Sequence, residues 1–179
     1  MKVPLEPEAA RALTFQAYPS QPAIDGVRYI PLKKHRALEG SFLELLRLND
    51  GIMEGLPEPF TPRQFNVART TPGRLNAFHV HPKEAQDDLW CVLDGMLQVW
   101  LVDLRVGSAT IGQKRCYLLN AEEPGWLFIP AGVAHGYHAG AAGALLLYAV
   151  NVQFNLENPN EGRLPWDYFG ADLWAEDRG

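Results

Sequence analysis

The sequence has 179 residues, of which 47% are hydrophobic and 21% charged, and its formal net charge is −5 at pH 7. This length suits one domain with a sizeable core, and the composition is typical of neither a disordered nor a membrane-embedded chain. The negative charge and the lack of a long basic run argue against nucleic acid as a partner. The first residues, MKVPLEPEAARALTF, do not resemble a signal peptide, and no apolar run reaches membrane-spanning length, so we expect a cytoplasmic protein without a membrane partner.

The chain opens with residues rich in Pro and Ala, in which a short helix is possible over 7–15. Residues 41–49, SFLELLRLN, fit a strand or a helix, and the Gly- and Pro-rich residues 50–63 predict a loop. From residue 64 onward, short apolar runs bounded by turn residues are typical of strands. These runs, with VRYIPL before them, are QFNVART, LNAFHVH, DLWCVL, MLQVWLVDL, CYLLN, GWLFIP and ALLLYAVNVQF.

No long segment with helical periodicity interrupts this series, so the sequence predicts an all-β sandwich or barrel. We expect one domain over 1–179, with an N-terminal extension over 1–27, a core at about 28–167 and a C-terminal tail over 168–179 packed outside. The dipeptide Asp94-Gly95 predicts a tight hairpin turn between two strands. Cys91 and Cys116 lie in apolar runs and are interpreted as buried free thiols.

The stretch HVHPKEAQDD, residues 79–88, contains a candidate metal site. On a strand His79 and His81 point to the same side, because residues i and i+2 share a face. Asp88 can open the returning antiparallel strand and lie opposite His81. Glu84 is a rival for the carboxylate, but it falls in the intervening loop.

A third imidazole comes from His135, in IPAGVAH. Three neutral imidazoles and one carboxylate suit a divalent ion such as Zn, Fe, Mn or Ni, and they leave room for water or substrate. His79, His81, Asp88 and His135 are therefore the predicted metal ligands. The alternative is that one or more of these histidines is an ordinary hydrogen-bonded or surface group.

The spacing G-RLNAF-HVH-PKEAQD-D-LWCVLD-G, followed by PAG-VA-H, resembles the two motifs of the cupin superfamily. This resemblance implies a cupin-type double-stranded β-helix, also called a jelly-roll barrel, with the four predicted ligands converging inside. Asp88 stands where most cupins have Glu, and its gap is longer.

A longer resemblance, over about 28–167, is to the dTDP-4-dehydrorhamnose 3,5-epimerase family. It is carried by FLE, QFN, GRLNAFHVH, AQDDLW, VWLVDLRVGSATIG, IPAGVAHGY, LLLY and EGRLPW. The resemblance implies proton chemistry beside the ketone of a nucleotide sugar, with His79 as the base and Tyr148 as the acid. It also implies a small-molecule substrate and a homodimer formed by strand exchange near the N-terminus. The substrate-binding residues that we predict from it are Glu44, Gln64, Asn66, Asn76 and Glu161.

Several departures from the family pattern affect the expected chemistry. Asn76 and Glu39 stand where the family has Arg, and Asp88 stands where it has Lys, which weighs against a dTDP-sugar because these cations pair with the sugar diphosphate. Together, His81 and Asp88 place two potential metal ligands in the pocket where the family carries out its catalysis.

The two roles predicted for His79 conflict, because a metal-bound imidazole normally carries a proton on its other nitrogen and cannot be the base. Three hypotheses follow from the sequence. The protein is an epimerase of a keto-sugar or related carbonyl compound, a metal-dependent cupin enzyme of another class such as an oxygenase or lyase, or a cupin that only binds a small ligand.

Overall fold

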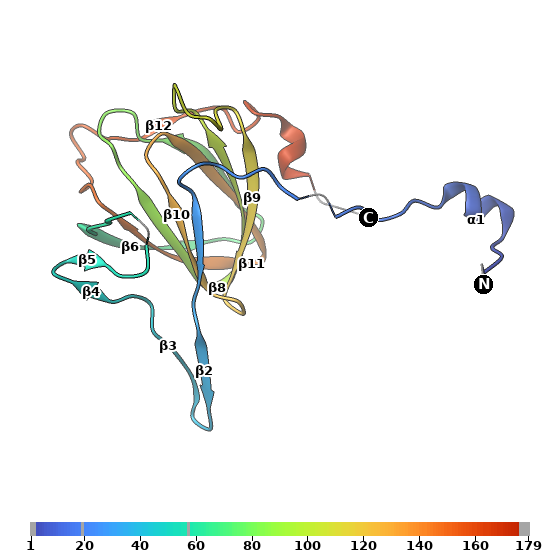
Figure 1. The fold of residues 1–179 in the computed structure, drawn as a ribbon, viewed down its shortest axis with the longest axis horizontal. Helices are drawn as coiled ribbons and strands as arrows, with labels where there is room; N and C mark the ends of the chain where they lie inside the picture. The colour runs from blue at the N-terminus through green and yellow to red at the C-terminus, as the bar shows by residue number, and fades with distance from the viewer. Residues whose placement is uncertain (1–2, 19, 57, 176–179) are drawn as a thin grey trace.

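The computed structural model describes residues 3–18, 20–56 and 58–175, and strands form most of it (Figure 1). The helix predicted over 7–15 is present as α1, which ends at Ala12. Residues 41–49 contain no helix: the ends of this segment lie in β3 and β4, and residues 44–47 between them are irregular. In chain order the elements are α1 (Pro7–Ala12), β1 (Arg28–Pro31), β2 (Lys34–Ala37), β3 (Gly40–Leu43), β4 (Leu48–Asn49), β5 (Ile52–Met53), β6 (Gln64–Thr70), β7 (Leu75–Val80), β8 (Asp88–Asp103), β9 (Lys114–Asn120), β10 (Gly125–Ile129), β11 (Val133–Val150), β12 (Gly162–Arg163) and the 3₁₀ helix η1 (Ala171–Trp174).

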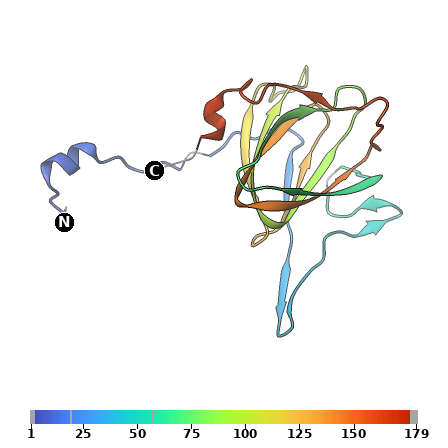
Figure 2. The ribbon, with the colours of Figure 1, turned by 180° about the vertical axis from the view of Figure 1, so that it is seen from behind.

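Eight strands form one antiparallel sheet, in the order β1-β10-β8-β11-β7-β12, with β6 also paired to β11 and β9 to β8. The long strands β8 and β11 pair along most of their length and curve around the barrel, so each contributes to two of its walls (Figures 1 and 2). Leu97, Leu101, Leu127 and Ile129 are almost completely buried between these walls. Burial of these apolar side chains is the main favourable contribution to the fold.

The predicted turn at Asp94-Gly95 is wrong, because both residues lie inside the continuous strand β8. Gly95 has φ +72, and the pairing of β8 with β11 shifts register beside it. A Cβ atom on Gly95 would lie 2.1 Å from the carbonyl oxygen of Gly143. The glycine therefore marks a β-bulge that bends a long strand, a feature that needs the same backbone freedom as a hairpin turn.

Two segments project from the barrel (Figure 2). The β2–β3 hairpin extends below it and exposes Leu38 and Phe42, and α1 lies beyond the barrel with no buried residue. The C-terminal tail instead packs on the barrel, where Phe169 and Trp174 contact Phe78 at ring-centroid distances of 4.9 and 5.2 Å. This agrees with the predicted packing of the tail up to residue 175; residues 176–179 lie outside the described part.

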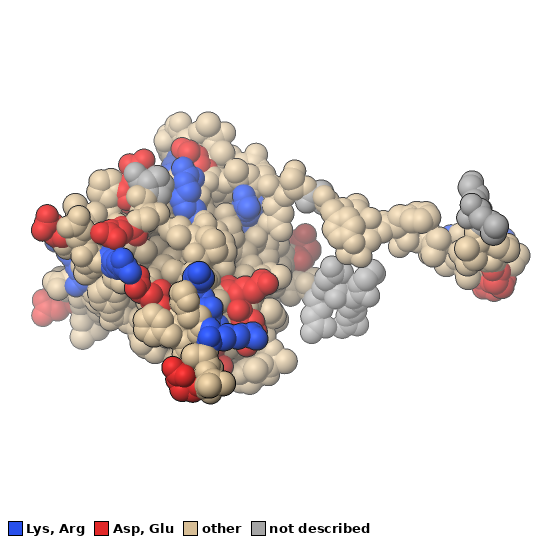
Figure 3. Space-filling model, turned by 60° about the horizontal axis from the view of Figure 1, so that its bottom comes forward, with Lys and Arg blue, Asp and Glu red and all other residues tan. Residues whose placement is uncertain are grey.

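On the face shown in Figure 3, acidic and basic side chains are interspersed rather than gathered into areas of one sign. Within the described residues, no helix is long and apolar enough to cross a membrane. Both cysteines are free thiols, and Cys91 is buried whereas Cys116 is partly exposed, so the prediction of buried free thiols is confirmed in full only for Cys91.

Candidate functional site

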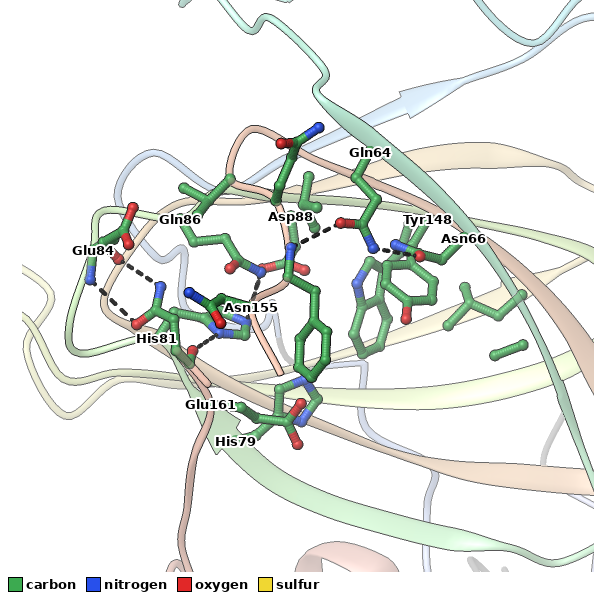
Figure 4. Close-up of a pocket in the computed structure, with 18 of the residues that line it drawn as sticks. Gln64, Asn66, His79, His81, Glu84, Gln86, Asp88, Tyr148, Asn155 and Glu161 are labelled. Atoms are coloured by element: carbon green, nitrogen blue, oxygen red, sulfur yellow. Dashed lines mark hydrogen bonds and ion pairs between the residues drawn. The ribbon is translucent and has the colours of Figure 1, made fainter. Parts of the chain in front are cut away.

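A cavity of about 400 Å³ opens between β6, β7, β8, β11 and the segment that leads to β12 (Figure 4). Its volume lies in the range of small-molecule sites. Most of the predicted site residues lie around it. Those that line the cavity are Gln64, Asn66, Asn76, His79, His81, Asp88, Tyr148 and Glu161.

Two predicted residues are placed differently. His135 is 1% exposed and lies directly behind the lining, in contact with His79. Glu44 does not line this cavity, because it follows β3 outside the barrel and pairs with Arg47 at 2.7 Å on the surface. The structure therefore does not bring Glu44 to the site within its own chain.

The strand pairing of β7 with β11 brings two of the histidines together. His79 pairs with His135 across these strands, and their ring centroids are 4.1 Å apart. His81 follows the end of β7, with its ring 5.6 Å from that of His79 and 5.5 Å from that of His135. One nitrogen from each of the three rings lies within 4.8 Å of the other two, so the predicted convergence of the imidazoles is present.

Asp88 lies beside the imidazoles as predicted, but the strand pairing that places it there differs from the predicted one. The expected antiparallel pairing of His81 with Asp88 is wrong, because β7 pairs with β11 and β12, and β8 is paired elsewhere. Asp88 opens β8 between Ile129 and Val150 and is 3% exposed. Its Oδ2 atom still lies 3.2 Å from Nε2 of His81 and 3.9 Å from Nε2 of His135.

Backbone carbonyl groups fix the tautomers of two of the histidines. Nδ1 of His135 donates to the carbonyl oxygen of Val133 at 3.0 Å, and Nδ1 of His81 donates to that of Asn160 at 2.5 Å. A carbonyl oxygen can only accept, so in each neutral ring Nε2 presents a lone pair. The side-chain nitrogen of Gln86, 3.2 Å from Nε2 of His81, can donate to that lone pair.

Burial and charge separate the protonation behaviour of the three rings. Burial lowers the pKa of both His79 and His135 to about 3, so both rings are neutral at pH 7. Burial also opposes a charge on His81, but the Asp88 carboxylate and the Asn160 carbonyl outweigh it and raise the pKa of His81. His81 therefore binds a proton more readily than the other two rings do, because it lies beside the Asp88 carboxylate.

Tyr148 lies on β11, where it pairs with Asn66 of β6 on one side and Trp90 of β8 on the other. Figure 4 shows its phenol on the cavity wall. Burial, followed by the nearby charges of Asp88 and Glu161, raises the pKa of this phenol. Tyr148 is thus protonated at neutral pH and can donate a proton into the cavity.

Arg163, on β12, is a cavity residue that the sequence prediction missed. Its guanidinium pairs with Glu161 at 2.5 Å and donates to Oδ1 of Asn76 at 3.1 Å. It thus brings a positive charge to the position where the family pattern has an Arg in place of Asn76. The signal was present in EGRLPW, because Arg163 stands two residues after Glu161, but β12, which carries Arg163, is only two residues long.

Amide side chains form the opposite wall and the rim. Gln64 donates to Asn66 at 2.7 Å and accepts from the backbone N–H of Phe154 at 2.8 Å. On the rim, the side-chain oxygen of Asn160 accepts from the backbone N–H groups of Lys83 and Glu84. Glu84, the rival ligand, lies on this exposed rim and outside the imidazole cluster.

The antiparallel barrel with a polar interior cavity is a cupin-type double-stranded β-helix, as predicted from the sequence. A family model described as dTDP-4-dehydrorhamnose 3,5-epimerase matches residues 21–170. The chain therefore belongs to this family, which confirms the resemblance and the predicted class of enzyme, a sugar-nucleotide isomerase or epimerase.

Relatives and solved structures agree with this assignment. The Bacillus subtilis spore coat polysaccharide biosynthesis protein SpsL is 39% identical over 145 residues, which cover 80% of this chain and 91% of that protein. A dTDP-4-dehydrorhamnose 3,5-epimerase of Pseudomonas aeruginosa is 36% identical over 130 residues, or 69% and 72% of the two chains. The Legionella pneumophila dTDP-6-deoxy-D-glucose-3,5-epimerase, solved with dTDP-4-keto-L-rhamnose, superposes with a TM-score of 0.72 at 28% identity, covering 87% of this chain and 80% of that one.

Proposed function

We propose that the protein inverts a carbon atom next to the ketone of a keto-sugar, with a nucleotide-linked sugar such as dTDP-4-keto-L-rhamnose as the reference substrate. The observation that carries this proposal is that His79 and Tyr148 line the same cavity in a member of this family. Removal of the proton beside the ketone moves the electron pair onto the carbonyl oxygen and forms an enolate. Return of a proton to the opposite face restores the ketone with the carbon inverted, and no oxidant or reductant is consumed.

The two side chains suit opposite halves of this reaction. His79 is neutral and can accept the proton from carbon, whereas Tyr148 keeps its proton and can deliver it. The phenol lies on β11 and the imidazole on β7, so they reach the cavity from different strands. This placement supports proton removal on one face and proton return on the other.

Charges around the cavity restrict how a sugar diphosphate could bind. Of the described lining residues, Arg163 is the one cation, and Glu84, Asp88 and Glu161 are acidic. A diphosphate needs charge-assisted donors, so we assign Arg163 as its partner. The acidic lining equally suits an uncharged keto-sugar, and the substrate test must therefore compare both kinds.

The test is to incubate the protein with dTDP-4-keto-L-rhamnose and, separately, with a free 4-keto-6-deoxy sugar, and to follow the epimers by proton NMR. We expect inversion beside the ketone of at least one of them, and loss of that inversion in His79→Asn. If the wild-type protein inverts neither substrate, the proposal is wrong.

The imidazole cluster with Asp88 supports a second candidate, a metal-dependent cupin enzyme of another class such as an oxygenase or lyase. The NMR experiment separates this candidate from the first, since it predicts an unchanged sugar. Metal bound to a protein that leaves the sugar unchanged would support the second candidate.

We further propose a homodimer formed along the free edge of β6. Within the described residues, β6 pairs only with β11, and it exposes Phe65 and Val67. An unpaired strand edge with exposed apolar side chains favours addition of a strand from another chain. The projecting β2–β3 hairpin, with Phe42 64% exposed, is the segment that we expect to cross to the partner.

The dimer prediction can be checked by sedimentation equilibrium. The wild-type protein should have twice the 20.0 kDa mass of one chain. The Val67→Arg substitution should lower the measured mass toward that of a single chain. Val106→Arg is the control, because Val106 is 97% exposed and lies away from β6, so this variant should sediment as the wild type does. A wild-type protein with the mass of one chain at all concentrations would contradict the dimer.

A further inference from the structure

A buried hydrogen-bond donor in the wall of the cavity has no acceptor in the described chain. The indole of Trp90, on β8, lines the cavity and is 3% exposed, and its Nε1 atom has no hydrogen-bond partner. An indole nitrogen can only donate, and a buried donor without an acceptor costs free energy of folding. Because Trp90 borders the cavity, a bound ligand can supply the missing acceptor.

Trp90 lies beside both groups that are proposed to move protons. Its indole is stacked over the ring of His79, with an interplanar angle of 30° and ring centroids 6.2 Å apart. On the neighbouring strand it pairs with Tyr148. A base and an acid that invert a carbon atom approach opposite faces of a planar enolate. The enolate oxygen lies in that plane, so it faces the wall between the base and the acid, which is where Trp90 lies.

Three other side chains of the cavity that could donate are engaged elsewhere. His81 is paired with Asp88 at 3.2 Å, and Arg163 is assigned to the diphosphate. Nδ1 of His79 is also buried without a partner, but this ring is assigned to proton removal. Asp88 stands two residues before Trp90 in β8 and, as a carboxylate, can only accept hydrogen bonds. Trp90 is therefore the donor best placed for an oxygen that gains negative charge.

We propose that the indole N–H of Trp90 donates a hydrogen bond to the ketone oxygen of the sugar and stabilises the enolate. This role rests on the proposed function, because the oxygen gains charge only when a proton leaves the neighbouring carbon. The electron pair of the broken C–H bond moves onto the oxygen, the proton moves to His79, and the indole keeps its own proton. Donors fixed in advance around a developing oxyanion make one of the largest contributions to catalysis.

The rings of His135 and Tyr137 offer the indole a weaker contact. Both are T-shaped relative to Trp90, with centroid distances of 5.1 and 6.1 Å. An N–H that points at an aromatic face gains less than one that is hydrogen-bonded to an oxygen atom. If such a contact were the whole role of this N–H, its removal would change stability but not the rate of inversion.

The test is Trp90→Phe in the full chain, with Trp100→Phe as the matched control. Trp100 is also on β8 and its Nε1 is also buried without a partner, but it does not line the cavity. The substrate is dTDP-4-keto-L-rhamnose or the free 4-keto-6-deoxy sugar, whichever the wild type inverts. Trp90→Phe should lower kcat about 10²-fold, as loss of one oxyanion donor does, and change KM little. Trp100→Phe should keep the wild-type kcat.

Exchange of solvent deuterium separates this role from that of the proton donor. Without the N–H, the proton leaves carbon more slowly, so deuterium incorporation and inversion should fall by the same factor in Trp90→Phe. Loss of the acid, Tyr148, would slow inversion but still allow exchange. Slowed inversion with undiminished exchange in Trp90→Phe would therefore overturn the proposal.

The indole N–H resonances of the wild-type protein give a measurement that does not depend on how Trp90→Phe folds. The chain has five tryptophans, so single Phe variants of the other four assign the Trp90 signal by elimination in ¹⁵N-labelled protein. Addition of the sugar should move the Trp90 proton downfield and leave that of Trp100 in place. An unmoved Trp90 signal at saturating sugar would contradict the hydrogen bond.

These outcomes distinguish the hydrogen bond from the proposed function. Inversion by the wild type at a rate that Trp90→Phe matches would refute the role of Trp90 and retain the epimerase. A wild-type protein that inverts neither sugar would refute both.

Discussion

Replacing Tyr148 by Phe is expected to lower kcat for inversion of the keto-sugar by about 10²- to 10⁴-fold, the usual contribution of a general acid or base. The change removes one oxygen atom from a side chain of β11 whose ring stays packed, so the fold should be retained. The loss should fall on kcat rather than on KM, because the phenol acts on the reacting carbon and not on the nucleotide. Tyr117→Phe is the matched control, because Tyr117 lies on β9 and does not line the cavity.

Deuterium exchange distinguishes the role of Tyr148 from that of His79. In Tyr148→Phe, His79 can still remove the proton and return it to the same face, so solvent deuterium should enter the sugar without inversion. In His79→Asn, both exchange and inversion should be lost. A Tyr148→Phe protein that inverts the sugar at the wild-type rate would exclude the phenol as the acid.

Replacing Asp103 by Asn is expected to destabilise the protein by about 3 kcal/mol at pH 7, the lower end of the cost of breaking a buried ion pair. The carboxylate is 0% exposed and accepts two hydrogen bonds from the Arg105 guanidinium, at 2.9 and 2.8 Å. It also accepts from Ser108 at 2.6 Å and from Thr110 at 2.7 Å. Arg105 reaches further, to the carbonyl of Asp25, so the network attaches the chain before β1 to the barrel. Chemical denaturation measures the loss.

The effect of pH gives this prediction a second readout. Hydrogen bonds from Arg105, Ser108 and Thr110 hold the pKa of Asp103 well below its ordinary value of 3.8. A lowered native pKa contributes stability that is complete above the unfolded value and is lost as the pH falls through the native one. The difference between wild type and Asp103→Asn should therefore be constant from pH 7 to about 5 and shrink below about 4.

Asp94→Asn serves as the control for Asp103→Asn. Asp94 lies in the same strand, but its side chain is 72% exposed and its contact with Arg69 is 3.9 Å long. Exposed pairs of this kind contribute at most about 1 kcal/mol. Equal losses in the two variants would contradict the structural role assigned to Asp103.

The site could be predicted largely because its residues lie in short motifs with a defined strand periodicity. His79 and His81 share a side after a two-residue step, and IPAGVAH places His135 at the start of another strand. Such local patterns predicted the cluster even though the strand pairing expected for Asp88 was wrong. Several chain paths can bring the same side chains to the inside of a small barrel, so the residues were easier to predict than the topology.

What the sequence could not supply depended on long-range packing. Gly95 needs a positive φ in a hairpin turn and in a bulge alike, so only the pairing of β8 with β11 decides between them. Arg163 enters the cavity from a two-residue strand that has no periodicity to detect. Glu44 was predicted to bind substrate because it lies in a family motif. In the structure it lies outside the cavity of its own chain and pairs with Arg47.

The most direct test of the proposed chemistry is to incubate dTDP-4-keto-L-rhamnose with the wild-type protein in D₂O and to locate the deuterium by NMR. Proton removal in this cavity predicts deuterium on a carbon that flanks the ketone, together with inversion there, and neither in His79→Asn. A sugar recovered without deuterium, from protein shown to be folded, would contradict it.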